Sequence, residues 1–281
     1  MVLPDETVQR SYLEQAQLAQ VHRWLAAACA PPGTAEPLDE MFAPGARLHW
    51  LDAALPLAVE QLPALGSAEL IEVETPEFLD AHSVRLPVTR VPARVAGADA
   101  GDTLDGTLTF SFTVEPALLP QLTTVVFADG PSGAWVPEEQ SVHPIHPVSR
   151  ILGLKHRWHA LVEDPQRSAA PFAELISADF VMDWGDGSVR GEAELADWVT
   201  SSASAVSAAR HDLVSFDWAA LDDGAYRAQF GLEWSGRSRS GKPMAARSEH
   251  RWRIRERPGH RYAAIERMDV ELVVPFHLLS P

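Results

Sequence analysis

The side chain best suited to proton transfer is a histidine on a segment with the alternating pattern of a β-strand. In the segment 244–256, His250 shares one face with Trp252. Because that face also carries the apolar residues, we expect it to point into the domain. A histidine there can act as a general acid or base near neutral pH. We therefore predict that His250 is catalytic and is oriented by Glu266 or Tyr226; the alternative is a hydrogen-bonded histidine that only fills the interior.

Two other polar side chains are weaker candidates for the same chemistry. Asp183 and His211 lie on the alternation phase opposite to the apolar residues of their segments. The pattern therefore predicts a surface or capping role for both, unless a bulge turns them inward.

Bulky aromatic residues recur on the inward phase of these segments. Aromatic walls favour flat ring compounds through buried area and stacking. We therefore predict a small apolar or aromatic molecule as the ligand; the alternative is a core filled by the protein's own indole rings. The predicted ligand-binding residues are Trp158, Trp184, Phe230, Trp234 and Trp252.

The patterns that mark cofactor and metal sites are missing from the sequence. It contains no Gly-x-Gly-x-x-Gly, no Gly-x-Ser-x-Gly and no His-Glu-x-x-His. The single cysteine, Cys29, excludes an intrachain disulfide and a cysteine-rich zinc site. His143 and His146 are close together, but they lie in a proline-rich stretch without a third ligand. We expect no cofactor and no metal.

Charge and hydropathy narrow the choice of partners. The 281 residues carry a net charge of −16, which argues against nucleic acid. The excess lies in residues 1–148, with 6 basic and 20 acidic residues, whereas residues 149–281 have 17 and 19. No apolar run approaches the roughly 18 residues of a membrane span, and the start does not resemble a secretory signal. We expect a cytoplasmic protein that does not bind membranes.

The sequence repeats itself at an offset of 134 residues. Without a gap, 9 of the 30 residues from 21 to 50 are identical to their counterparts. The matches pair Trp24 with Trp158 and Trp50 with Trp184. We therefore predict a tandem duplication in which these tryptophans occupy equivalent elements.

The repeat divides the chain into two predicted domains, 1–148 and 149–281. The first includes the proline-containing linker. Its candidate strand 122–128 offers no titratable residue, so we expect a degenerate pocket there and the working pocket in the second domain.

The second copy shows helices first and a long meander afterwards. The spacing predicts helices over 151–163 and 192–209 and a short strand over 179–184 between them. Four further strands are predicted at 213–221, 226–235, 244–256 and 262–274. This order is typical of an α+β fold with helices packed on one face of a curved antiparallel sheet.

That order, with the stretches 172–184 and 249–254, resembles the ketosteroid-isomerase-like superfamily, also called nuclear-transport-factor-2-like (NTF2-like) or SnoaL-like (polyketide cyclase). The resemblance implies a cone-shaped fold, here in two tandem copies. It places Trp158 at the isomerase's tyrosine, Trp184 at its base and His250 at its acid. Because tryptophan has no basic site, steroid-type isomerisation is disfavoured. The superfamily contains many activities and non-catalytic proteins, so fold alone does not give function.

Two functions remain open from the sequence. The first is a cofactor-free cyclase, dehydratase or isomerase-type enzyme that acts on a small apolar ring compound in the second domain. The second is a non-catalytic binding or assembly module built as an intrachain pseudo-dimer. Proteins of this superfamily commonly pair through their sheets, so we expect Arg247, Arg251 or Arg253 to contact carboxylates of the first half.

Overall fold

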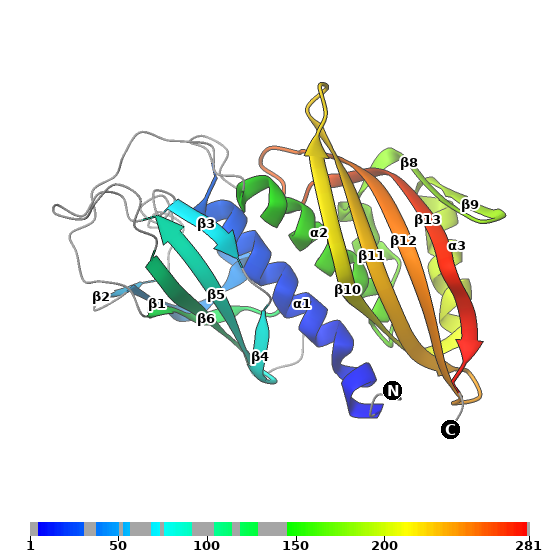
Figure 1. Ribbon diagram of the computed structural model, residues 1–281, viewed down its shortest axis with the longest axis horizontal. Helices are drawn as coiled ribbons and strands as arrows, with labels where there is room; N and C mark the ends of the chain where they lie inside the picture. Colours follow the sequence, from blue (N-terminus) through cyan, green and yellow to red (C-terminus); the bar gives the residue numbers. More distant parts are fainter. Residues whose placement is uncertain are drawn as a thin grey trace. The chain divides into compact units, whose positions relative to one another are not determined.

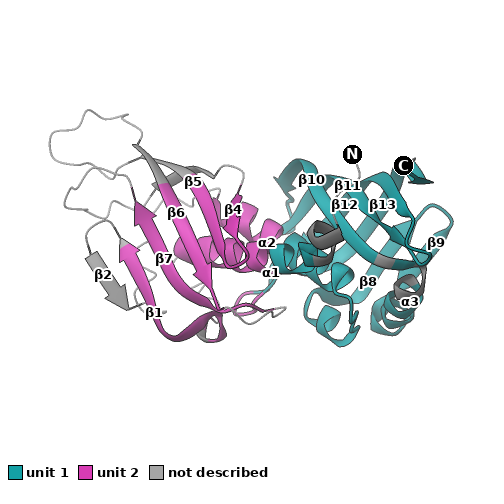
Figure 2. Ribbon diagram, turned by 90° about the horizontal axis from the view of Figure 1, so that it is seen from below, with its two compact units in different colours: residues 1–15, 154–257, 262–281 teal, residues 16–153, 258–261 magenta. Residues whose placement is uncertain are grey.

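The computed structural model divides into two compact units (Figures 1 and 2). Unit 1 comprises residues 1–15, 154–257 and 262–281, and unit 2 comprises residues 16–153 and 258–261. The residues that the structure describes are 5–30, 38–50, 53–56, 69–73, 76–91, 104–113, 119–128 and 145–279.

The units do not coincide with the domains 1–148 and 149–281, which stay a prediction. The two long helices, α1 (Asp5–Ala28) and α2 (Ile145–Glu163), are each divided between the units. The first part of α1 groups with unit 1 because its side chains bond there. Gln15 Nε2 donates to the carbonyl of His211 at 2.9 Å, and Gln15 Oε1 lies 2.7 Å from His156 Nδ1.

Unit 1 holds a six-stranded sheet with the order β10-β11-β12-β13-β8-β9. All neighbouring strands are antiparallel except β13 and β8, which are parallel. Helix α3 lies against β8 and β9 (Figure 1). Besides α2, the elements are η3 (Ala170–Glu174), β8 (Ile176–Trp184), β9 (Gly187–Arg190), α3 (Gly191–Ala205), β10 (Val206–Ala220), β11 (Ala225–Ser238), β12 (Pro243–Arg255) and β13 (Ala264–Leu278).

Unit 2 holds a seven-stranded sheet with the order β2-β1-β7-β6-β5-β3, and β4 pairs with β5. Its parallel pair is β1 and β7. Besides α1, the elements are η1 (Asp39–Met41), β1 (Phe42–Trp50), β2 (Ala53–Pro56), β3 (Glu69–Val73), β4 (Glu77–Asp80), β5 (Ser83–Val91), β6 (Leu104–Phe112) and β7 (Leu122–Ala128).

The strand order shows that the chain is a tandem duplication. The two sheets match strand by strand, including the one parallel pair in each, when the order β9-β8-β13-β12-β11-β10 is aligned with β2-β1-β7-β6-β5-β3. Trp24 and Trp158 lie on the first helices of the copies, and Trp50 and Trp184 are the last residues of β1 and β8. The predicted α+β tandem is therefore confirmed. Each sheet is mixed because the first strand of each copy pairs with the last.

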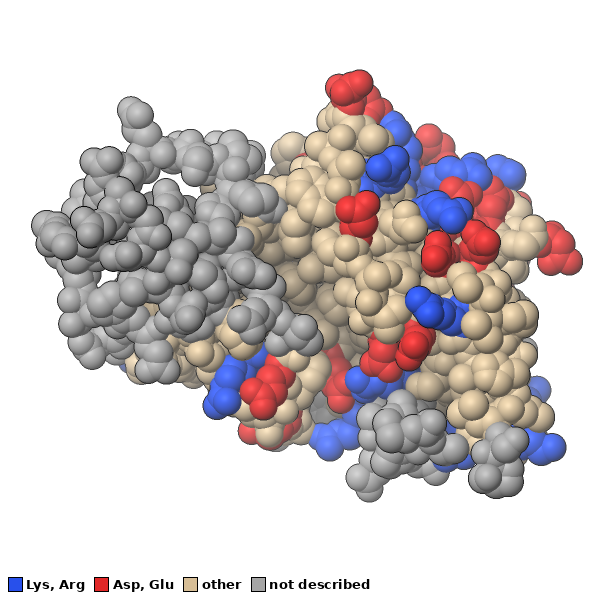
Figure 3. Space-filling model, viewed as in Figure 1, with Lys and Arg blue, Asp and Glu red and all other residues tan. Residues whose placement is uncertain are grey.

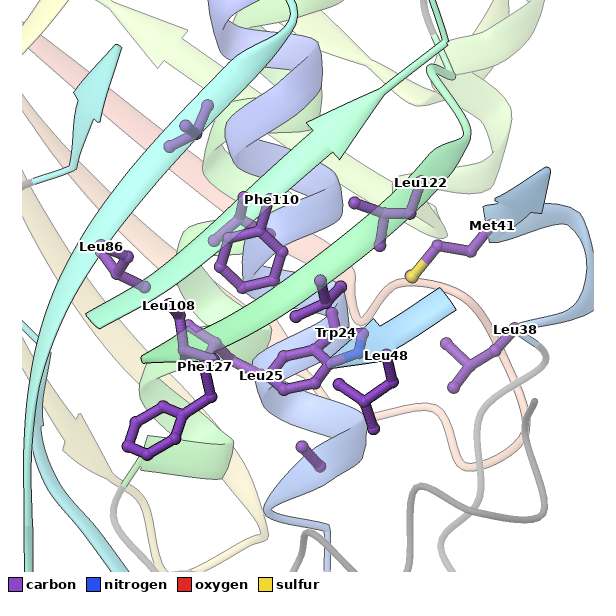
Figure 4. Packing of buried hydrophobic residues seen from close by; sticks show 14 of the residues in the cluster. Trp24, Leu25, Leu38, Met41, Leu48, Leu86, Leu108, Phe110, Leu122 and Phe127 are labelled. Atoms are coloured by element: carbon purple, nitrogen blue, oxygen red, sulfur yellow. The ribbon is translucent and has the colours of Figure 1, made fainter. Parts of the chain in front are cut away.

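The core of unit 2 forms where the apolar face of α1 meets its sheet (Figure 4). Trp24 is 1% exposed and packs edge-to-face on Phe110, with 5.4 Å between ring centroids. Val21 and Ala28 follow the helical spacing of that face and are also buried.

None of the described helices is long and apolar enough to cross a membrane.

The arginines on the outer face of the sheet in unit 1 are interleaved with carboxylates, as the mixed blue and red atoms of Figure 3 show. Arg251 pairs with Glu271 at 3.1 Å, and Arg253 pairs with Glu266 at 2.8 Å and also with Asp223. These partners all belong to unit 1. Such partly exposed pairs each contribute only about 0–1 kcal/mol to stability. The predicted contact of these arginines with the first half stays a prediction.

Candidate functional site

The sheet and helices of unit 1 form the walls of an open cavity of about 330 Å³. Its lining comes from α2, β8, α3 and the four strands β10 to β13, together with the loop after α2. The cavity is mostly apolar, and a few polar side chains are set into its wall. Of the sequence-predicted residues, those that line it are Trp158, Trp184, Trp234, His211 and His250.

Two of the aromatic residues predicted to bind the ligand pack in the core beside the cavity. Trp252 is 1% exposed, and its ring lies 4.9 Å from that of Phe230 and 6.0 Å from that of Trp158. Neither Trp252 nor Phe230 lines the cavity. They fill the interior next to it and support Trp158, which does line it.

The two side chains expected to orient His250 lie elsewhere. Tyr226 packs edge-to-face on Trp218, with 6.0 Å between ring centroids. The carboxylate of Glu266 bonds to Arg253 and Arg255. Neither Tyr226 nor Glu266 lines the cavity.

A β-bulge explains why alternation misplaced Glu266. In β13, Ile265 pairs with Ile254 while Arg267 pairs with Arg253, so Glu266 is the extra residue of a register shift. The residues after it therefore change phase, and Met268, not Glu266, continues the buried face.

Asp183 lies outside the cavity, on the ion-paired face. Its carboxylate accepts a hydrogen bond from Arg267 at 2.6 Å. A hydrogen bond from Ser188, with help from the Arg267 charge, lowers the pKa of Asp183 below its ordinary value. This environment is that of a surface carboxylate.

His211 is the polar residue that a bulge brings inward. The predicted helix 192–209 ends at Ala205, and β10 begins at Val206. The register of β10 against β11 shifts between Leu213 and Ser215. Alternation counted from the residues after this shift therefore puts His211 on the outer face, whereas His211 in fact faces inward. It lines the cavity.

Glu163, the last residue of α2, fixes the ring of His211. Its side chain is fully buried, and its Oε1 lies 2.9 Å from His211 Nδ1 while accepting the backbone N–H of His211 at 2.8 Å. Because a carboxylate can only accept here, Nδ1 carries the proton and Nε2 carries the lone pair. A carboxylate that holds a histidine in this tautomer also stabilises the imidazolium formed when Nε2 takes up a proton.

The partner Glu163 belongs to a polar stripe on α2 that sequence reasoning missed. Lys155, His159 and Glu163 follow each other at four-residue intervals on a helix that is buried nearly all round. That spacing puts them on one face. Three titratable side chains on one face of a buried helix were the signal that could have identified this part of the site.

His159 is a neutral second histidine beside His211. Its Nδ1 donates to the carbonyl of Lys155 at 2.8 Å, and its ring centroid lies 4.7 Å from that of His211. Burial, reinforced by the charge of Lys155, holds the pKa of His159 well below its ordinary value. Burial also lowers the pKa of Lys155, to about 8. His159 therefore lines the cavity as an uncharged ring.

His250 also lines the cavity as a neutral ring. Burial, with smaller contributions from His211 and Lys155, lowers its pKa to about 3. Its Nε2 lies 3.0 Å from Ser248 Oγ, and within the described chain its buried Nδ1 has no hydrogen-bond partner. At neutral pH His250 can exchange hydrogen bonds with a ligand, but it cannot supply the proton of an imidazolium.

The buried histidine makes stability depend on pH in a defined direction. The pKa of His250 is about 3 in the folded protein and about 6.5 in the unfolded chain. The unfolded chain therefore binds more protons between these values, and the free energy of unfolding falls as the pH is lowered from 6.5 toward 3.

Replacing His250 by glutamine should remove this part of the pH dependence. Between pH 7 and pH 5 the wild type should lose about 2 kcal/mol more unfolding free energy than the variant. Urea unfolding of both proteins at the two pH values measures the difference. Equal losses in the two proteins would show that His250 is charged or solvated in the folded state.

The described residues contain no group of three or more His, Cys, Asp or Glu side chains placed to hold a metal ion. The polar groups of the cavity are instead arranged as hydrogen-bonded pairs, His211 with Glu163 and His250 with Ser248.

Comparisons with known proteins give similarities of fold to solved structures. One is to a proposed aromatic ring hydroxylase from Novosphingobium aromaticivorans, with 15% identity and a TM-score of 0.44, over 48% of this chain and 95% of that one. Another is to the hexachlorocyclohexane dehydrochlorinase LinA-type3 from Novosphingobium barchaimii, with 12% identity, a TM-score of 0.41, and 48% and 90% coverage. A third is to an NTF2-like superfamily protein from Salmonella enterica, with 13% identity, a TM-score of 0.37, and 42% and 84% coverage.

No family model matches the sequence, and no curated protein matches it. The strand order and the parallel pair shared by both sheets define the architecture: the chain is a tandem of two copies of one α+β fold.

Proposed function

We propose that this protein is a cofactor-free enzyme that removes a proton from a small ring compound bound in the cavity of unit 1. His211 is the general base, and Glu163 orients it. The observation that carries the proposal is the contact between His211 and the buried carboxylate of Glu163 in the wall of an apolar cavity. This pair supplies a proton acceptor in an otherwise apolar wall, which a ligand held by apolar contacts alone does not require.

The chemical step follows from the tautomer. Nε2 of His211 takes a proton from a carbon atom of the ligand. The electrons of that C–H bond pass onto a neighbouring carbonyl oxygen as an enolate, or form a new C=C bond while a leaving group departs from the adjacent carbon with its bonding pair. Glu163 stabilises the resulting imidazolium through Nδ1. His159 and His250 stay neutral. The positive charge therefore remains on His211, whose ring is bonded to the carboxylate of Glu163. This step is shared by isomerases, dehydratases and cyclases that use no cofactor.

The walls define the kind of substrate. Trp158, Trp184 and Trp234 line the cavity, and indole faces favour flat rings by stacking and by buried apolar area. A cavity of about 330 Å³ lies at the lower end of ordinary ligand sites and suits a compound of one to three rings.

Deuterium incorporation into 2-tetralone, a bicyclic ketone with acidic C–H bonds, tests the proposal. In deuterated buffer, NMR should show exchange beside the carbonyl group faster with the protein than with buffer alone. Exchange at the buffer rate, with 2-tetralone bound, would contradict the proposal and favour the non-catalytic binding module.

A further inference from the structure

A cationic side chain lies in the cavity wall and is not used by the proposed proton transfer. Arg167, in the loop after α2, lines the cavity, and its Nη2 donates to the carbonyl of Val206 at 3.1 Å. Its backbone has a φ of 41°, in the left-handed region that a residue with a side chain rarely adopts. The turn is closed by a hydrogen bond from Arg167 N to the carbonyl of Asp164. The loop therefore holds this arginine in one place.

The guanidinium has unused capacity to bind an anion. It offers five N–H donors, and within the described chain the hydrogen bond to Val206 is its one recorded side-chain bond. Burial lowers the pKa of Arg167, against a partly compensating attraction from Asp164. It stays charged, however, because the ordinary pKa of arginine is far above neutrality.

Several other arginines of unit 1 are bonded to carboxylates. Arg157 donates to Glu174 at 3.0 Å, and Arg210 donates to Glu14 at 2.7 Å. Arg167, in contrast, uses a neutral carbonyl. A planar guanidinium in a partly desolvated wall is best matched by a carboxylate, which it can bind with two parallel hydrogen bonds.

The position of Arg167 relative to the base limits the shape of such a ligand. Its partner Val206 and the base His211 lie on the same strand, β10, and both line the cavity. The register of β10 shifts between Val206 and Ala208, which turns Val206 to the face of His211. At about 3.3 Å per residue, the Cα atoms of Val206 and His211 are about 16 Å apart. An anion at Arg167 is thus at the far end of the ligand from the reacting carbon.

We propose that the cavity takes an elongated aromatic acid, whose carboxylate binds Arg167 and whose rings lie along the tryptophan-lined wall toward His211. This inference rests on the proposed function, because it places the substrate in the same cavity. The sequence predicted an apolar ring compound, and the inference adds that this compound carries a carboxylate. It also gives a role to Arg167, which no sequence motif marked.

Calorimetric titration with 2-naphthoate and with its neutral analogue 2-naphthamide tests the inference. The wild type should bind 2-naphthoate about 10- to 100-fold more tightly than the amide, as expected for hydrogen bonds to a charged group. The variant Arg167→Gln should lose that preference while its affinity for the amide stays unchanged, which shows that the cavity is intact. Arg239→Gln, which removes the same charge at an exposed loop residue, should keep the preference.

Equal affinity of the wild type for the two probes, no binding of either, or an unchanged preference in Arg167→Gln would each overturn the inference. The titration does not depend on proton transfer. If 2-naphthoate binds as expected while 2-tetralone shows no exchange, the anion site stands and the proposed catalysis fails.

Discussion

Replacing His211 by glutamine should lower the rate of deuterium incorporation into bound 2-tetralone by about 10²–10⁴-fold, the usual contribution of a positioned general base. Glutamine is close in size and can still donate a hydrogen bond to Glu163, but it has no atom that takes up a proton at neutral pH. The rate of exchange at saturating ketone, followed by NMR, measures the loss.

Two further variants separate catalysis from general damage to the protein. Glu163→Gln should also lower the rate, because an amide can donate to Nδ1 and so admits the tautomer with the proton on Nε2. His277→Gln, which changes an exposed histidine on β13, should leave the rate unchanged. An unaltered rate in His211→Gln would remove His211 from the mechanism.

Replacing Trp252 by alanine should lower the free energy of unfolding by about 3–5 kcal/mol, as for other buried large aromatic residues. The Trp252 ring is 1% exposed and contacts Trp158, Phe230 and His159. Its removal leaves a void that the surrounding sheet and helix cannot close without moving. Urea unfolding followed by circular dichroism measures the change.

Trp218 provides a matched control on the same sheet. It is only partly buried and packs on Tyr226. Trp218→Ala should therefore cost clearly less than Trp252→Ala, about 1 kcal/mol. A loss of stability in Trp252→Ala no larger than that of the control would mean that the ring belongs to the ligand site and not to the core.

Periodicity was a good guide to the fold because a strand repeats every two residues whatever its partners are. The four predicted strands of the meander correspond to β10, β11, β12 and β13. The recurrence of Trp24 as Trp158 and of Trp50 as Trp184 predicted the duplication because two copies of one fold keep similar residues at equivalent positions. The parallel pairing of β8 with β13 was not predictable in this way, since alternation carries no information on strand direction.

The polar residues of the site were harder to predict because bulges change the phase within a strand. The register shift in β10 brings His211 inward, and the shift in β13 leaves Glu266 among the outer arginines. A bulge of this kind depends on how two strands pair, which the sequence of one strand does not encode.

The partner of His211 is also distant in the sequence. Glu163 lies 48 residues away, at the end of a helix, and comes into contact only when α2 and β10 pack together. Arg167 was missed for a similar reason: its place in the wall depends on the turn closed by Asp164 and on the carbonyl of Val206. Backbone groups do not appear in a sequence pattern.

The proposed proton transfer requires that Glu163 holds His211 with its lone pair at Nε2, and ¹⁵N NMR of the imidazole nitrogens measures this. The His211→Gln variant assigns the signals of His211, and the spectrum of the wild type is recorded at pH 8. We expect a proton bonded to Nδ1 and an unprotonated Nε2, and a change of both signals in Glu163→Gln. A proton on Nε2 in the wild type, or signals unaffected by Glu163→Gln, would show that Glu163 does not set the tautomer of His211.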